Sequence, residues 1–213
     1  MQSPNETKPR WERRKDARPQ ELLAAALELF TDRGFAATRL EDVARAAGVS
    51  KGTLYLYFEN KQELFKAVVR DNIVQVIGEA EEELAAAEDI SSEDLLRAML
   101  EKWWNHSSDR RAAGLTRLMM AESGNFPELA AFYEEEVNVR GGALITKVLE
   151  RGIARGEFYP VDPYVMMQVI TAPIMMLMMW SHKFFPCDQQ EIDPKAYMET
   201  FLGLVKRGLA PQK

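Results

Sequence analysis

Helical periodicity runs through almost every segment of this 213-residue chain after residue 18 and limits it to few folds. Apolar side chains recur three or four residues apart, as Leu23, Leu27 and Phe30 do, and this spacing places them on one side of a helix. No two alternating apolar and polar segments flank a short turn, which is the pattern of a β-hairpin. The sequence therefore predicts an all-α fold with about nine helices.

Local signals mark where these helices begin and end. The first helix is expected to begin near Pro19 and to end at Gly34, because glycine adopts the left-handed conformation that follows many helices. Gly48 is expected to end another. Further helix starts carry a capping residue or pair: Thr38 with Glu41, Ser50, Asn60 with Glu63, Asp162-Pro163 and Asp193-Pro194.

Charge is divided unevenly along the chain. The net charge is −6 overall, but residues 1–70 carry 13 basic and 10 acidic side chains, a net of +3, and residues 71–213 carry 14 and 23, a net of −9. Such asymmetry indicates that the basic end faces a polyanion. We expect a flexible basic arm over residues 1–18, a first domain over residues 19–66 and a second over residues 67–213.

Several classes of protein are disfavoured by what the chain contains. One cysteine, Cys187, allows no intrachain disulfide framework, and two histidines, His106 and His182, leave little for a metal site. No phosphate-binding glycine loop, nucleophile elbow or histidine–carboxylate pair is evident, so we expect no catalytic residue, no cofactor and no enzyme activity. The most apolar stretch, residues 165–180, is shorter than the roughly 20 residues of a membrane span. We expect a cytoplasmic protein.

Two short helices joined by residues 47–50 have the pattern of a helix-turn-helix. The turn requires Gly48 for a close approach, and the second helix presents its outer side to the major groove of DNA. Periodicity alone equally allows a helical hairpin in any all-α domain. In a DNA-binding protein, the side chains placed to meet bases or phosphates are those of Lys51, Gly52, Thr53, Tyr55 and Tyr57, with Lys61 at the start of the next helix.

The run from about residue 22 to residue 69 closely resembles the DNA-binding domain of TetR/AcrR-family transcriptional regulators. The resemblance depends on a gap-free set of residues: Ala26, Phe30, Gly34, Phe35, Thr38, Val43, Ala44, the run 47–55, Tyr57, Phe58, Lys61 and Leu64. It implies that Lys51, Gly52, Thr53, Tyr55, Tyr57 and Lys61 contact DNA and that Thr38 and Arg39 lie near its backbone. Leu56 departs from the residues often found at its position.

The second half resembles the C-terminal domain of the same family at Glu122, residues 126–129 and residues 149–158. That resemblance implies a homodimer that binds a small ligand. Methionine is concentrated here, and it adapts its shape to irregular apolar surfaces. Each large side chain taken alone is more simply part of a core, but as a group we expect these to line a cavity: Trp103, Trp104, Met119, Phe126, Phe132, Met176 and Trp180.

The last two predicted helices, residues 163–183 and 194–208, are apolar on more than one side. A helix that is apolar all round is buried, and a second copy of the chain would bury these two. The sequence thus predicts a homodimeric DNA-binding regulator, a repressor released from operator DNA by a small, largely apolar effector. The alternative is a constitutive DNA-binding protein without a ligand switch.

Overall fold

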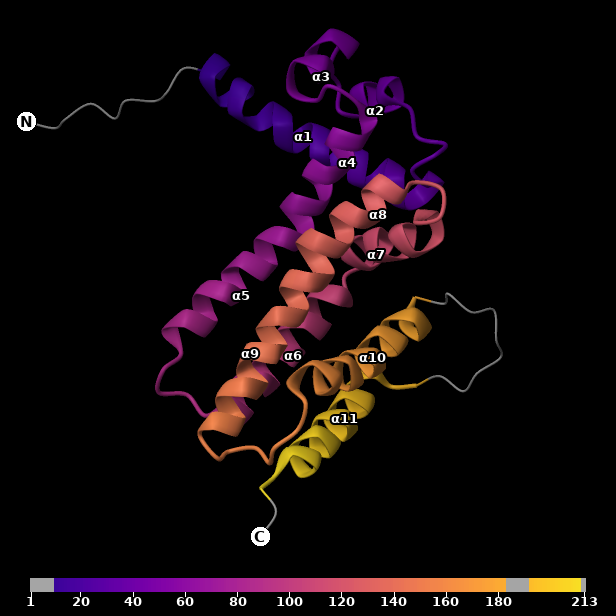
Figure 1. Cartoon of the computed structure of the whole chain (residues 1–213). Helices are drawn as coiled ribbons and strands as arrows, with labels where there is room; N and C mark the ends of the chain where they lie inside the picture. The colour runs from indigo at the N-terminus through magenta and orange to yellow at the C-terminus, as the bar shows by residue number, and fades with distance from the viewer. Residues whose placement is uncertain (1–9, 183–191, 212–213) are drawn as a thin grey trace, which may run out of the picture.

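The computed structural model describes residues 10–182 and 192–211, with side chains from residue 19 on. This described part is helical and contains no strand (Figure 1). Its elements are α1 (Arg10–Arg33), α2 (Leu40–Ala46), α3 (Lys51–Tyr57), α4 (Lys61–Val69), η1 (Arg70–Val74), α5 (Gln75–Ala86), α6 (Ser92–Ser107), α7 (Arg110–Glu122), α8 (Pro127–Tyr133), η2 (Glu134–Val139), α9 (Arg140–Ala154), α10 (Pro163–Ser181) and α11 (Pro194–Leu209).

The two η segments are π-helical turns inside longer helices. α4, η1 and α5 run on as one helix, and so do α8, η2 and α9, which makes nine continuous helices in the described ranges. The prediction of an all-α fold with about nine helices is confirmed. One long helix follows Asn60 and joins the two halves (Figure 1).

The ends of the first helices agree with the local signals except at two points. Gly34 and Gly48 have φ of +85° and +67°, and the Ser50 and Asn60 side chains accept from the amides of residues 53 and 63. However, α1 begins at Arg10 rather than near Pro19, because residues 10–18 are rich in helix-favouring side chains and the proline removes only one hydrogen bond. Residues 1–9 of the expected arm lie outside the described residues.

The second difference is the start of α2. The N-cap residue is Arg39, and no side chain caps that end, so Thr38 does not form the predicted capping box. The Thr38 side chain is 2% exposed, and its hydroxyl donates to the carbonyls of Leu29 at 3.1 Å and Gly34 at 2.7 Å. These bonds hold the loop between α1 and α2 in place.

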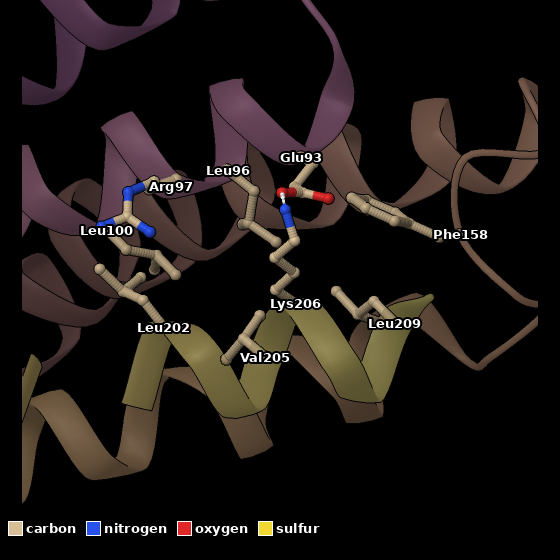
Figure 2. A pocket seen from close by; sticks show the side chains of 9 residues that line it. All are labelled: Glu93, Leu96, Arg97, Leu100, Phe158, Leu202, Val205, Lys206 and Leu209. Atoms are coloured by element: carbon tan, nitrogen blue, oxygen red, sulfur yellow. Dashed lines mark hydrogen bonds and ion pairs between the residues drawn. The ribbon is translucent and has the colours of Figure 1, made fainter. Parts of the chain in front are cut away.

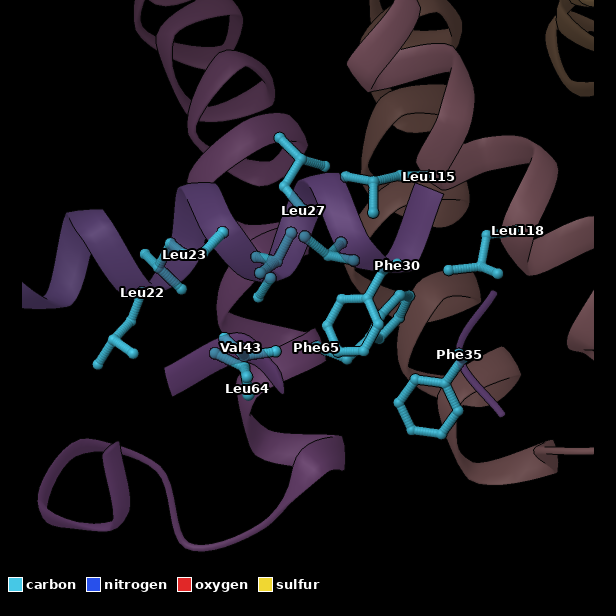
Figure 3. Close-up of a cluster of buried hydrophobic side chains, with 14 of the residues drawn as sticks. Leu22, Leu23, Leu27, Phe30, Phe35, Val43, Leu64, Phe65, Leu115 and Leu118 are labelled. Carbon is cyan, nitrogen blue, oxygen red and sulfur yellow. The ribbon is translucent and has the colours of Figure 1, made fainter. Parts of the chain in front are cut away.

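Aromatic rings form the centre of the N-terminal core (Figure 3). Phe30, Phe35 and Phe65 lie with ring centroids 5.5–5.6 Å apart, and Phe126 meets Phe35 edge-on at 4.7 Å. Aromatic pairs of this geometry contribute about 0.5–1.5 kcal/mol beyond their burial. Because Phe126 precedes α8, this core joins the first helices directly to the C-terminal half.

A second core lies under α10 and α11, and polar contacts fasten it. Figure 2 shows Lys206 of α11 against Glu93 of α6, an ion pair of 2.5 Å above a crevice of about 20 Å³ that is too small for a ligand. Arg151 of α9 donates to three carbonyls of the α5–α6 loop, at Ala87, Glu88 and Ile90. These bonds fix the far end of the long helices.

Candidate nucleic-acid interface and ligand cavity

The helix-turn-helix is built by apolar packing on one side, which leaves the other side of α3 facing outward. Val43 and Ala44 of α2 and Leu54 of α3 are buried. The outward side of α3 carries the predicted contact residues Lys51, Gly52, Tyr55 and Tyr57, all exposed, while Thr53 is half-buried with its hydroxyl 2.8 Å from that of Ser50. Figure 1 shows α3 at the end of the molecule farthest from α11, where a groove of DNA can approach it.

Lys51 is held by an acidic partner in this structure. Its Nζ lies 2.5 Å from Oε1 of Glu41 on α2 and 5.7 Å from the ring centroid of Tyr55. The hydrogen bond between Lys51 and Glu41 lowers the pKa of the Glu41 carboxyl and raises the pKa of the lysine. Because both side chains are exposed, the pair contributes little to stability, and a phosphate can replace the carboxylate.

Lys61 directs its ammonium group at the protein's own backbone. Its Nζ donates to the carbonyls of Phe35 at 2.7 Å, Ala36 at 3.1 Å and Thr38 at 3.0 Å, and it lies 4.5 Å from the centroid of the Phe35 ring. Burial lowers its pKa. Lys61 and Thr38 therefore hold the α1–α2 loop, whereas the Arg39 side chain is exposed.

A large cavity of about 830 Å³ lies among α5, α6, α7, α9 and α10. Its volume is within the range of roughly 300–1,000 Å³ that small-molecule sites occupy. The lining is mainly apolar and includes Ile73, Trp103, Met167 and Met178. Both π-helical segments contribute to it, and they also contact each other. π-Turns inside α-helices occur frequently at functional sites.

The structure places one of the seven predicted ligand residues at this cavity. Trp103 lines the cavity, but the other six lie elsewhere. Met119 and Phe126 pack in the N-terminal core, and Phe132 lies under the Arg70 guanidinium. Trp104 packs against the second core, and the Trp180 ring meets the Tyr197 ring edge-on. The Met176 side chain is 38% exposed. The periodicity identified apolar helix faces, but which face meets the cavity depends on how the helices are rotated against one another.

Sequence reasoning missed the polar groups of the cavity, above all His106. Burial lowers the pKa of this imidazole, and its Nε2 is buried without a hydrogen-bond partner among the described residues. His106 follows Trp103 by three residues, so both lie on one side of α6, and that spacing was the available signal. Cys187 lies outside the described residues.

A helix-turn-helix with an exposed second helix, joined by continuous helices to an all-α domain with a ligand-sized cavity, defines a class of DNA-binding regulators. Residues 22–68 match the family model described as bacterial regulatory proteins of the tetR family, and residues 86–194 match the tetracyclin repressor-like C-terminal domain. The chain belongs to the TetR family of transcriptional regulators, whose members are not enzymes.

Individual relatives agree with this assignment. The chain is 25% identical over 189 residues to the HTH-type transcriptional repressor KstR2 of Mycolicibacterium smegmatis, covering 88% of this chain and 90% of the relative. The crystal structure of the transcriptional regulator FadR from Bacillus subtilis, in complex with stearoyl-CoA, superposes with a TM-score of 0.73 at 25% identity over 89% of this chain and 98% of that chain. A putative regulator from Saccharomonospora viridis, in complex with choline, shares the fold at a TM-score of 0.75 and 17% identity, with 93% of this chain and all of that chain covered.

Proposed function

We propose that this protein is a homodimeric repressor released from its operator when a largely apolar ligand fills the 830 Å³ cavity. One observation carries the proposal: a single continuous helix runs from the DNA-binding head to the cavity wall. That helix begins at Lys61, which holds the α1–α2 loop, and it lines the cavity with Ile73, Val76, Ile77 and Ala80. A ligand that displaces this wall moves the head.

A second contact couples the same two regions. α7 lines the cavity with Ala112 and Thr116 and packs closely on α1 of the head, where a β-carbon added to Gly114 would lie 2.6 Å from Cγ2 of Thr31. Packing this close transmits displacement, because interiors of native density do not deform continuously. Differential binding of a few kcal/mol is enough to lower operator affinity tenfold or more.

For the DNA contacts, we propose that α3 enters the major groove with Lys51, Gly52, Thr53, Tyr55 and Tyr57, and that Arg39 reaches a phosphate. We assign Thr38 and Lys61 an indirect role, because their polar atoms hold the loop that places Arg39. In a dimer, the two α3 helices would meet half-sites separated by about 34–36 Å, one helical turn of DNA, or somewhat more.

We propose that a second copy covers the outer side of α10 and α11. α10 is the one helix in the described ranges that is long and apolar enough to cross a membrane by composition alone, which is weak evidence for a span. Tyr164, Val165, Val169 and Leu204 are between 55% and 64% exposed on these helices. A two-fold interface that pairs them buries this surface, so we expect a dimer in the cytoplasm and no membrane association.

The ligand class has support from the relatives. FadR from Bacillus subtilis was crystallised with stearoyl-CoA, and the sequence relative from that organism that is 28% identical over 112 residues is named a fatty acid metabolism regulator protein. The mainly apolar cavity of this chain accommodates an acyl chain or another apolar body of similar length. We therefore propose an apolar effector, with no metal or cofactor required.

Fluorescence anisotropy with DNA from upstream of the protein's own gene tests the proposal. We expect binding that weakens steeply with salt and is released by one member of a panel of apolar compounds. Ala80→Trp places an indole in the cavity wall, whereas Ala85→Trp adds the same group on the exposed side of α5. Release lost in the first variant and kept in the second supports the switch; tight binding that nothing releases favours a constitutive DNA-binding protein.

A further inference from the structure

The outward side of α3 centres on Leu56, a residue with no role among the DNA contacts assigned above. Leu54 is 0% exposed and faces the N-terminal core. Successive residues of an α-helix are about 100° apart, so Leu56 points about 200° away from Leu54, almost directly out of the head. Its side chain is 83% exposed, the highest value among the large apolar side chains of the described residues. Tyr55 and Tyr57 turn about 100° to either side of it, so Leu56 is the first side chain of α3 that an approaching surface meets.

Gly52 lies one turn before Leu56 on the same side of α3. A β-carbon added there would lie 3.8 Å from Oγ of Ser50, which is ordinary van der Waals contact. The fold therefore has room for an alanine at this position, although glycine weakens a helix relative to alanine. The missing side chain instead leaves the backbone beside Leu56 open to close approach, which lets the floor of a groove reach the leucine.

The polar side chains of α3 lie away from this outward centre. Lys51 is the single charged residue of the helix. It lies about 140° around the helix from Leu56, and its Nζ is 2.5 Å from Oε1 of Glu41 on α2. The Thr53 side chain is half-buried, with its hydroxyl 2.8 Å from that of Ser50. The outward centre of α3 therefore presents an isobutyl group and bare backbone, without a side-chain donor or acceptor for the polar edge of a base.

We propose that Leu56 contacts the C5-methyl group of a thymine in each operator half-site and sets a base preference by apolar contact. This inference rests on the proposed entry of α3 into the major groove. Thymine alone among the four bases presents an apolar group there, while the edges of guanine, cytosine and adenine present hydrogen-bond donors or acceptors. A leucine against one of those edges would take water from a polar group and give it no partner. Against the methyl group, the leucine buries apolar surface on both molecules.

Removing single methyl groups from the DNA tests this contact. The full chain first selects its site from a pool of random duplexes. Each thymine of the selected half-site is then replaced by deoxyuridine, which keeps every hydrogen-bonding group and lacks the methyl group. Fluorescence anisotropy at fixed salt measures the affinity. We expect about fourfold weaker binding at one thymine of each half-site, and about fifteenfold weaker binding when both are replaced, from the burial of one methyl group per contact.

Variants assign the contact to Leu56. In Leu56→Ala the loss caused by deoxyuridine should fall below about twofold, because alanine does not reach the methyl group. Ile90→Ala is the matched control: it truncates a side chain that is 47% exposed in the loop between α5 and α6, and it should keep the fourfold loss. A loss that stays fourfold in Leu56→Ala overturns the assignment. The exposure of Leu56 makes its truncation harmless to folding, which equal melting temperatures of wild type and variant verify.

The outcomes separate this inference from the proposed function. A selected half-site that contains no thymine, or one whose affinity deoxyuridine leaves unchanged at every thymine, overturns the role of Leu56 and leaves α3 in the groove. Equal binding to every duplex in the pool, or no binding at low salt, overturns both. A loss at one thymine that depends on Leu56 supports both the entry of α3 into the groove and the role of Leu56, whether or not an apolar ligand releases the DNA.

Discussion

Replacing Lys61 with methionine separates two roles for this residue. The sequence pattern predicts a DNA contact, whereas the structure directs Nζ to three backbone carbonyls at 2.7–3.1 Å, those of Phe35, Ala36 and Thr38. Methionine keeps the length and most of the apolar stem but has no donor. The three carbonyls then lose their partner, and the loop between α1 and α2 loses its attachment to α4.

The magnitude follows from those bonds. The three hydrogen bonds share one partly exposed ammonium group, so we count them together as one hydrogen bond to a charged group, about 1.5–3 kcal/mol. The contact of the ammonium with the Phe35 ring adds about 0.5–1 kcal/mol. The methionine side chain recovers part of this free energy by packing on the Phe35 ring. We expect Lys61→Met to lower the free energy of unfolding by about 2–3 kcal/mol, which for a chain of this size lowers the melting temperature by about 4–12 °C.

Thermal unfolding followed by circular dichroism measures this effect, at equal protein concentration because dimer formation shifts the melting temperature. Lys51→Met is the matched control: it removes the same charge from the head, but the Lys51 side chain is exposed, so its melting temperature should hardly change. In operator binding at low temperature, Lys51→Met should reduce the salt slope by about one unit and Lys61→Met should not. An unchanged melting temperature together with a reduced salt slope for Lys61→Met would refute the structural role and establish a phosphate contact.

Three further predictions follow from burial and packing. Gly152→Ala should lower the free energy of unfolding by about 1–2 kcal/mol, because its new β-carbon would lie 2.1 Å from the Phe158 ring and this overpacking exceeds the gain in helix propensity. Gly78→Ala meets nothing within 4 Å and should raise the free energy of unfolding by about 0.5–1 kcal/mol. Urea titrations that show both variants stabilised would contradict this prediction. The pKa of His106 is lowered in the folded chain, so below about pH 6.5 the unfolded chain binds more protons than the folded chain. The wild type should therefore lose more stability than His106→Phe between pH 7 and pH 5. Parallel profiles of unfolding free energy against pH for the two proteins would rule this out. Leu56→Ala, at a side chain 83% exposed, should change stability by less than about 0.5 kcal/mol yet weaken operator binding, and unchanged binding would place Leu56 outside the groove.

Signals that act within a few residues were predictable from the sequence. Gly34 and Gly48 end helices because their backbone conformation is local, and Ser50 and Asn60 cap helices because the amides they accept from are three residues away. Thr38 shows the limit of such patterns. It has the spacing of a capping box, but its hydroxyl finds two carbonyls of the preceding helix and loop, so tertiary contacts prevail over the local motif.

The cavity could be predicted as a property of the domain but not residue by residue. Phe126 was expected in its wall and instead packs on Phe35, 91 positions earlier in the chain, because the head offers an aromatic cluster that it completes. His106 could not be assigned from its neighbours in sequence, since it lines the cavity only where α6 packs against α9. Helix rotation and long-range pairing decide these contacts, and periodicity fixes neither.

The two π-helical turns change which side chains the long helices direct at the cavity. A π-turn holds one residue more than an α-turn, so the residues that follow it are rotated by about 100° around the helix relative to an unbroken α-helix. η1 and η2 contact each other beside the cavity that both of them line. Each long helix can therefore pack one side into the N-terminal core and direct a different side at the cavity, while its backbone continues without a break.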